Sequence, residues 1–133
     1  MRLVIDTNIW IHYLIQSSLL SLDSLFINEE TELLFSHELL DEFLEVSSRS
    51  KFSRYFTQHD VSELAILLEG RFPPIEVTSV INICRDPHDN FLLALSKDGD
   101  ADYLITGDND LLTIGTFENT KIISLAEFEK LIS

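Results

Sequence analysis

The chain has few of the residues that cross-link small secreted proteins or interrupt regular structure. Its 133 residues include one cysteine, three prolines and four glycines. A single cysteine, Cys84, excludes an internal disulfide and a multi-cysteine zinc site, which is typical of a reducing compartment. No apolar stretch reaches the roughly 18 residues needed to span a bilayer, and the first residues lack the layout of a secretory signal. We therefore expect a soluble, cytoplasmic protein.

Basic residues are also scarce. Nine Lys and Arg face 23 Asp and Glu, which leaves a net charge of −14. This balance argues against a protein that binds nucleic acid mainly by neutralising phosphates. Only residues 46–59 carry several basic side chains without any acid, namely Arg49, Lys51 and Arg54, interleaved with aromatic residues. This segment is a candidate nucleic-acid contact surface, although a solvated junction between a helix and a loop explains it almost as well.

Short apolar runs alternate with helical patterns along the whole chain. The runs predict strands at residues 3–5, 32–36, 75–77, 103–106 and 121–124. Helical patterns occupy residues 9–15, 37–46, 60–71, a stretch that opens near residue 86, a short stretch ending at 112, and 125–132. With 45% hydrophobic residues the chain can bury one core but is too short for two ordinary domains. We therefore expect a single domain over residues 1–133, an α/β/α three-layer sandwich around a parallel sheet of about five strands.

Four acidic residues stand just past the predicted strands or early in the helices that follow them. They are Asp6, Glu42, Asp89 and Asp108. In open parallel sheets, binding sites form beyond the carboxyl ends of the strands, so these carboxylates are expected to meet. Mg²⁺ and Mn²⁺ prefer oxygen ligands, and four carboxylates can hold one or two such ions. Without metal, the mutual repulsion of the carboxylates should raise at least one pKa.

Each acidic residue also has a purely structural interpretation. Asp86, followed by Pro87, is best explained as the N-cap of a helix. Asp89 could be an acid in the first turn that faces the helix dipole, and Asp6 and Asp108 could serve as caps as well. Glu42 shares its helix face with other acids and would ordinarily be a solvated residue. The four histidines show no metal-ligand spacing, so we assign them surface or core-edge roles. They are His12, His37, His59 and His88, of which only His88 is near the acidic residues.

The order of these motifs resembles the PIN-domain family, and most closely the toxin components of prokaryotic toxin–antitoxin systems. The resemblance rests on Asp6-Thr7-Asn8, Ser36 with residues 39–43, residues 85–92 and residues 101–112. It implies a metal-dependent endoribonuclease that uses Mg²⁺ or Mn²⁺ and an RNA substrate. The family's acidic quartet corresponds here to Asp6, Glu42, Asp89 and Asp108, which act as catalytic and metal-binding residues. Further site residues are Asp110 as a frequent fifth carboxylate, Thr7, Asn8 and Thr106 as polar neighbours, and Asp86 as a supporting residue.

Several alternatives stay open at this stage. The chain could be a nuclease of RNA processing or of DNA structures such as flaps, or a catalytically silent PIN-fold binding module. A phosphoryl-transfer or receiver domain also gathers acids at strand ends, but Lys97 and Lys121 are poorly placed for it. The resemblance implies a cognate antitoxin protein as partner. Residues 9–27 carry more large apolar side chains than a helix pair can bury, so we expect this segment to bind the antitoxin or to form a homodimer.

Overall fold

The computed structural model describes residues 1–16 and 28–132 of the chain. The described strands are β1 (Arg2–Ile5), β2 (Glu32–Leu33), β3 (Tyr103–Ile105), β4 (Thr116–Phe117) and β5 (Thr120–Ile123). The described α-helices are α1 (Thr7–Ile15), α3 (His37–Ser47), α4 (Gln58–Arg71), α5 (Pro87–Asp98), α6 (Asn109–Ile114) and α7 (Leu125–Ile132). A short 3₁₀ helix, Ser50–Phe52, follows α3. Over these described residues, no helix is both long and apolar enough to cross a membrane.

The five strands form one sheet in the order β2-β1-β3-β5-β4. The pairs β1–β2, β1–β3 and β3–β5 are parallel, whereas β4 pairs with β5 in the antiparallel direction. The chain passes from β1 to β2 on one side and later returns to β3 on the other side of β1. The carboxyl ends of β1 and β3 therefore flank a topological switch point, the place where sites form in doubly wound sheets.

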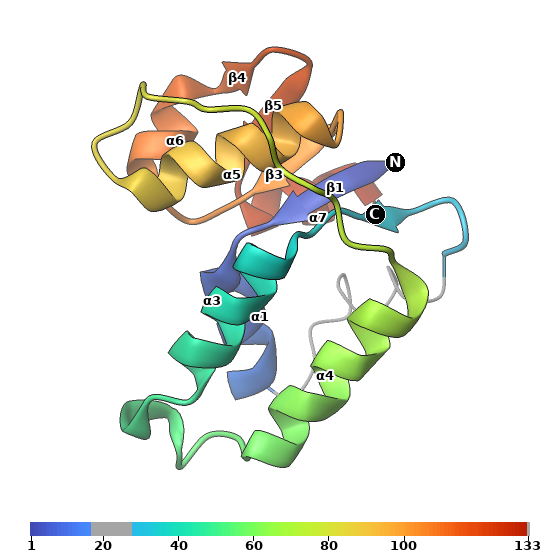
Figure 1. The fold of residues 1–133 in the computed structure, drawn as a ribbon, viewed down its shortest axis with the longest axis vertical. Coiled ribbons are helices and arrows are strands. Elements are labelled where there is room, and N and C mark those ends of the chain that lie inside the picture. Colours follow the sequence, from blue (N-terminus) through green and yellow to red (C-terminus); the bar gives the residue numbers. More distant parts are fainter. Residues whose placement is uncertain (17–27, 133) are drawn as a thin grey trace.

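The helices divide between the sheet and a lobe beside it. Helix α5 packs against β1 and β3, α6 contacts β5, and α3 contacts both α1 and α4. Figure 1 shows α1, α3 and α4 gathered below the strands, with α5 in front of the sheet and α7 behind it. Phe128 of α7 and the β-strand residues Leu3, Val4 and Leu104 are fully buried, as expected for strands covered on both faces. The α/β sandwich expected from the sequence is confirmed, with one antiparallel strand at its edge.

The expected strand at residues 75–77 is not formed. Ile75 N donates to Phe35 O at 2.8 Å, but Pro73 and Pro74 have no N–H to extend that pairing. Just beyond the expected strand, the amides of Thr78 and Ser79 donate to the carboxylate of Asp98. The fifth strand is β4, whose two residues are too short to produce a recognisable apolar alternation.

Helix α1 uses its large apolar side chains within the core. Trp10 and Leu14 are buried, at 7% and 8% exposed, and the ring of Trp10 meets that of Tyr13 edge to face at 5.9 Å between centroids. The rest of the expected partner-binding segment, residues 17–27, lies outside the described residues. Within α1, the apolar residues expected to face a partner therefore contribute to the core, with Tyr13 and Ile15 only partly buried.

Candidate functional site

Asp6 is placed at the switch point by the backbone of β1. Its amide donates to Ile105 O of β3 at 3.0 Å, so the residue stays tied to the sheet at the point where α1 begins. The side chain is buried at 3% exposed. Its Oδ2 accepts a hydrogen bond from Thr106 Oγ1 at 2.8 Å, and its Oδ1 lies 3.3 Å from Nε2 of His88. Both carboxylate oxygens of Asp6 therefore have partners within the protein.

Thr106 connects the ends of β1 and β3. Its hydroxyl donates to Asp6 and accepts from the amide of Asp108 at 3.1 Å. Asp108 in turn caps α6, because its Oδ1 accepts from the amides of Asp110 and Leu111 at 2.8 and 3.3 Å. An N-cap carboxylate satisfies amides that the helix leaves free. Asp108 thus has a structural role, and the same role fixes its position beside the end of β3.

The start of α5 brings a third carboxylate to the same place. Asp86 is the N-cap and accepts from the amide of His88 at 2.9 Å, and Pro87 occupies the first turn. Proline is favourable there because its missing N–H would have no partner in the helix. This start places Asp89 in the first turn, where it is 1% exposed. Its Oδ2 is buried and has no hydrogen-bond partner among the residues described.

Three carboxylates could hold a metal ion together. They belong to Asp89, Asp108 and Asp110 and are here called the Asp89 group. One carboxylate oxygen from each lies within 4.8 Å of the others. An all-oxygen donor set of carboxylates suits hard divalent cations. The orphaned oxygen of Asp89 supports this fit, since a buried charged oxygen without a partner is costly unless something compensates it. The chemistry of the residues present therefore fits a divalent metal.

The electrostatics of Asp89 agree with this interpretation. Burial, followed by the negative charges of Asp108 and Asp86, raises the pKa of Asp89 from 3.8 to about 6. His88 opposes this rise, but it does not cancel it. A carboxyl held out of water among other acids gives up its proton reluctantly, and a bound cation would remove that penalty. The sequence-based expectation of at least one raised pKa agrees with Asp89, where the repulsion between carboxylates adds to a larger contribution from burial.

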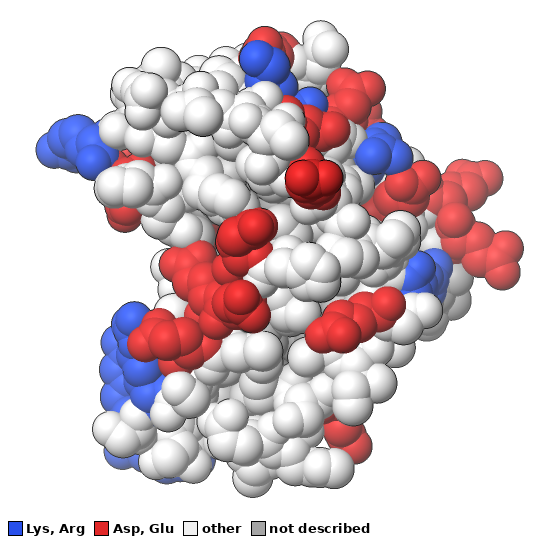
Figure 2. Space-filling model, viewed as in Figure 1, with Lys and Arg blue, Asp and Glu red and all other residues white. Residues whose placement is uncertain are grey.

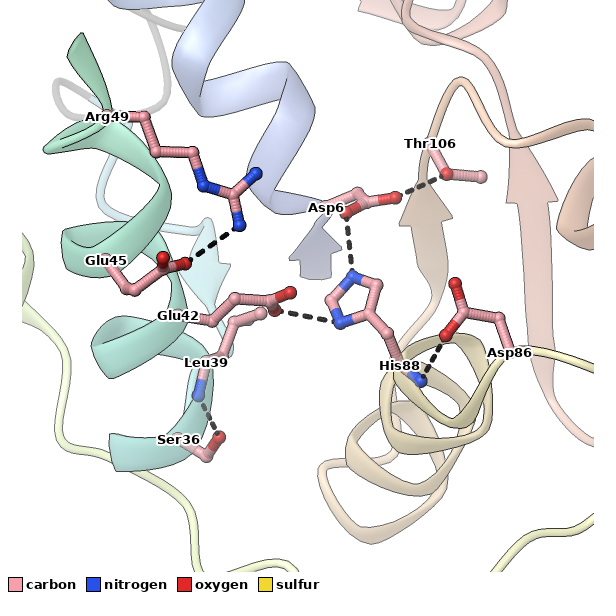
Figure 3. Close-up of polar contacts among 9 residues, drawn as sticks. All are labelled: Asp6, Ser36, Leu39, Glu42, Glu45, Arg49, Asp86, His88 and Thr106. Atoms are coloured by element: carbon pink, nitrogen blue, oxygen red, sulfur yellow. Dashed lines mark hydrogen bonds and ion pairs between the residues drawn. The ribbon is translucent and has the colours of Figure 1, made fainter.

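His88 lies between Asp6 and Glu42 (Figure 3). Its Nδ1 is 2.8 Å from Glu42 Oε2 and its Nε2 is 3.3 Å from Asp6 Oδ1. The hydrogen bond to Asp6 and the negative charges nearby raise the pKa of His88, although burial acts against them. Burial raises the pKa of Glu42, opposed first by the charge of His88. The imidazole of His88, on α5, thus connects Glu42 on α3 with Asp6 at the end of β1. These two carboxylates are here called the Asp6–Glu42 pair.

The five predicted carboxylates form one charged neighbourhood with two parts. Asp89, Asp108 and Asp110 belong to the three-oxygen group, while Asp6 and Glu42 contact His88. Asp6 still acts electrostatically on Asp89, whose pKa it raises. Of the predicted polar neighbours, Thr7 is buried at the first position of α1 and Asn8 is exposed.

Basic side chains flank the acidic surface on two sides. Arg49 pairs with Glu45 at 3.1 Å, Lys51 lies over the ring of Phe52, and Arg54 lies over the ring of Tyr55. These residues follow Glu42 along α3 and the 3₁₀ helix. On the opposite side, Arg85 contacts both carboxylate oxygens of Asp110, at 3.0 and 2.8 Å. Figure 2 shows basic surface above and below a hollow at the left edge, with acidic surface between them.

Sequence reasoning missed the positions of two residues. His88 was assigned a surface or core-edge role, yet it lies at the centre of the site at 26% side-chain exposure. The position of His88 between Asp86 and Asp89 in the sequence could have indicated its place in the site. A residue in the first turn of this helix faces the same carboxyl ends of the strands as Asp89 does. Arg85 immediately precedes that cap, and nothing in its spacing indicated a contact with Asp110, 25 residues later.

Comparison with protein families matches a PIN domain model to residues 2–110 of the chain. A search of curated proteins gives no match. The matched segment runs from β1 into α6 and contains all five carboxylates of the site, together with His88 and Arg85. PIN domains generally have a nuclease-type fold and need a divalent metal, in agreement with the oxygen donors of the Asp89 group. The chain therefore belongs to the PIN-domain family.

Proposed function

We propose that this protein is an endoribonuclease that hydrolyses RNA phosphodiesters with Mg²⁺ or Mn²⁺, and that it is the toxin of a toxin–antitoxin pair. The observation that carries the nuclease proposal is the buried Asp89 Oδ2, which has no hydrogen-bond partner in the part of the chain that the structure describes, in a residue grouped with the carboxylates of Asp108 and Asp110. A protein keeps such an oxygen in its interior at a cost in stability. Binding of one or two hard cations would compensate the charge of this oxygen and so offset the cost.

The five carboxylates take different roles in this proposal. Asp89, Asp108 and Asp110 would hold the metal, and Asp6 and Glu42 complete the acidic site. A bound divalent ion activates water and neutralises charge on the leaving oxygen of a phosphodiester. Thr106 connects the carboxylate of Asp6 to the backbone amide of Asp108 through its hydroxyl. Asp86 holds the first turn of α5, so that Asp89 and His88 project into the site. Thr7 and Asn8 supply polar groups at the start of α1.

The choice of RNA rests on the family resemblance and on the distribution of charge. A net charge of −14 disfavours tight, non-specific binding to a duplex. Arg49, Lys51 and Arg54 are exposed, and Lys51 and Arg54 lie over aromatic rings, an arrangement that suits phosphates and unstacked bases of a single strand. Arg85 provides a further exposed cation, beside Asp110. An RNA strand that crosses the hollow would contact both.

The partner proposal follows from the resemblance to toxin components. We infer a cognate antitoxin that restrains the enzyme in the cytoplasm, with an antitoxin side chain, most simply an arginine, pairing with the acidic site. The same reasoning gives a homodimer as a second partner proposal. Sedimentation of the protein alone and with the product of a neighbouring gene tests both, and a protein that is monomeric and binds no such product would contradict them.

The function is tested by incubating the protein with a mixture of single-stranded and structured RNA in Mn²⁺ or Mg²⁺. We expect internal cleavage that EDTA abolishes and that Glu42→Gln lowers by about a hundredfold or more. Asp41→Asn is the matched control, because Asp41 is exposed on the same helix and adjacent in sequence. Parallel reactions with single-stranded and flap DNA distinguish the alternative of a DNA nuclease. The proposal would be wrong if cleavage persisted in EDTA, or if Glu42→Gln and Asp41→Asn lost the same amount of cleavage activity.

A further inference from the structure

The position between Asp6 and Glu42 is already occupied by part of the protein. The two nitrogens of the His88 ring contact one oxygen of Glu42 at 2.8 Å and one of Asp6 at 3.3 Å (Figure 3). The other oxygen of Asp6 accepts from Thr106. A cation bridging Asp6 Oδ1 and Glu42 Oε2 would need the oxygen atoms that now face the imidazole. The ring and such a cation therefore compete for the same oxygens.

The backbone keeps the imidazole in this place. His88 stands in the first turn of α5, directly after Pro87, and its amide donates to the carboxylate of Asp86 at 2.9 Å. Proline restricts the backbone before it and begins the helix at a defined residue. The two carboxylates that the ring contacts come from β1 and α3, so the ring joins three elements. A side chain held by its own backbone and by two partners leaves the site only if both contacts break.

The Asp89 group differs in this respect. Its three oxygens lie within 4.8 Å of one another, and Asp89 Oδ2 has no hydrogen-bond partner among the described residues. Arg85 contacts Asp110, but its side chain is 87% exposed and can move into solvent. The Asp89 group is therefore open to a cation, while the Asp6–Glu42 pair is filled. This difference lies in the protein's own side chains.

We propose that His88 is a positioning residue that stands in for a second cation between Asp6 and Glu42, so that the native protein binds one divalent ion, at the Asp89 group. Removal of the imidazole would free Asp6 and Glu42 and create a second ion site. The inference rests on the metal-dependent function proposed above, and it specifies the number of ions and the residue that sets it. His88 would thereby also hold Glu42, and with it α3, against the sheet.

The test counts Mn²⁺ ions bound to the full chain at one fixed pH, by electron paramagnetic resonance of free Mn²⁺ during a titration. Wild type is expected to bind one ion. The variant His88→Ala is expected to bind a second ion. Its dissociation constant for this second ion should be at least about tenfold lower than the dissociation constant for any second ion in wild type. The double variant His88→Ala, Glu42→Gln should return to one ion. His59→Ala, which removes an exposed histidine paired with Glu63 on α4, is the matched control and should behave as wild type.

The possible failures are distinguishable. If wild type binds one ion and His88→Ala binds it with the same stoichiometry and affinity, the role of His88 is wrong while the proposed function stands. If His88→Ala binds no ion although circular dichroism shows it folded, His88 is itself a ligand and the inference is overturned. If wild type binds no Mn²⁺ at all, the proposed function fails first. Should His88→Ala not fold, His88→Asn replaces it in the same measurements, because asparagine is shorter than the ring and does not span both carboxylates.

Discussion

The two parts of the acidic site differ in how their charges are compensated. At the Asp6–Glu42 pair, hydrogen bonds from Thr106 and contacts with His88 take up three carboxylate oxygens. At the Asp89 group, a buried oxygen lacks a partner within the described residues, and burial together with the charges of Asp108 and Asp86 raises the pKa of Asp89 to about 6. The comparison shows that acidic residues at the same edge of the sheet can differ in how their charges are compensated. In one part the carboxylates are paired within the protein, and in the other a buried oxygen has no such partner among the described residues.

The largest effect is expected from removing the uncompensated carboxylate. Asp89→Asn takes away the central oxygen donor of the Asp89 group, so metal-dependent RNA cleavage should fall by about a hundredfold or more. Metal binding should weaken in parallel, as measured by Mn²⁺ titration. Asp100→Asn is the control, because Asp100 is exposed with φ of 51°, a conformation that asparagine tolerates well. Full activity in Asp89→Asn would show that the site's chemistry lies elsewhere.

The second effect concerns stability without metal. The folded protein holds the proton of Asp89 up to about pH 6, whereas the unfolded chain releases it near 3.8. Because the folded pKa is raised, this group's contribution to stability is complete below about pH 3.8 and is lost as the pH rises through about 6. At neutral pH the loss amounts to as much as about 3 kcal/mol. Asp89→Asn removes the charge and should therefore be more stable than wild type at neutral pH in EDTA.

Urea unfolding in EDTA at about pH 5 and about pH 8 measures this effect. The stability advantage of Asp89→Asn over wild type should grow between the two pH values, and saturating Mn²⁺ should reduce or reverse it, since only wild type retains the full donor set. The comparison uses the difference in free energy of unfolding between the variant and wild type at each pH. Most of the contribution from the titration of His88 and Glu42 cancels in this difference, because both proteins retain these residues. An advantage that is independent of pH would mean that Asp89 is not crowded as the geometry indicates.

The two parts also differ in their basic neighbours, which allows the RNA path to be located. Arg49, Lys51 and Arg54 lie on the side of α3, the helix that carries Glu42. Replacing all three by Gln should lower RNA affinity and flatten the slope of log affinity against log salt by up to about one for each phosphate that is no longer neutralised. Filter binding at several salt concentrations, with the catalytically impaired Glu42→Gln background, provides the measurement. Arg71→Gln, beside the ring of Phe72 on α4, serves as control, and an unchanged slope would place the RNA elsewhere.

The smallest effect is expected on the other side, at Arg85. Its two contacts with Asp110 are exposed and compete weakly with a cation for that carboxylate. Arg85→Gln should therefore tighten Mn²⁺ binding by about two- to fivefold, as is usual for an exposed ion pair. Arg49→Gln breaks a comparable exposed pair with Glu45 and should leave Mn²⁺ affinity unchanged. Weaker Mn²⁺ binding in Arg85→Gln would indicate that Arg85 holds Asp110 in its binding position.

Much of the architecture could be predicted because it depends on local rules. Apolar runs at residues 3–5, 103–106 and 121–124 correspond to β1, β3 and β5, since strands buried on both faces need continuous apolar sequence. The helix at Pro87 was recognisable from its capping residue and proline. The strand at 75–77 was predicted wrongly, because an apolar run does not reveal that Pro73 and Pro74 interrupt its pairing.

The sequence by itself determined which acids stand after strands and at helix starts, because caps and strand ends depend on neighbours in the chain. Only the tertiary structure decided which of those acids share a cation site and which are already paired. His88 is 82 residues from Asp6 in the chain, yet the two side chains are in contact. That contact depends on how α5 packs against β1 and on where α3 is held beside α1. Local periodicity carries no information on such distances, because the packing of the whole core sets them.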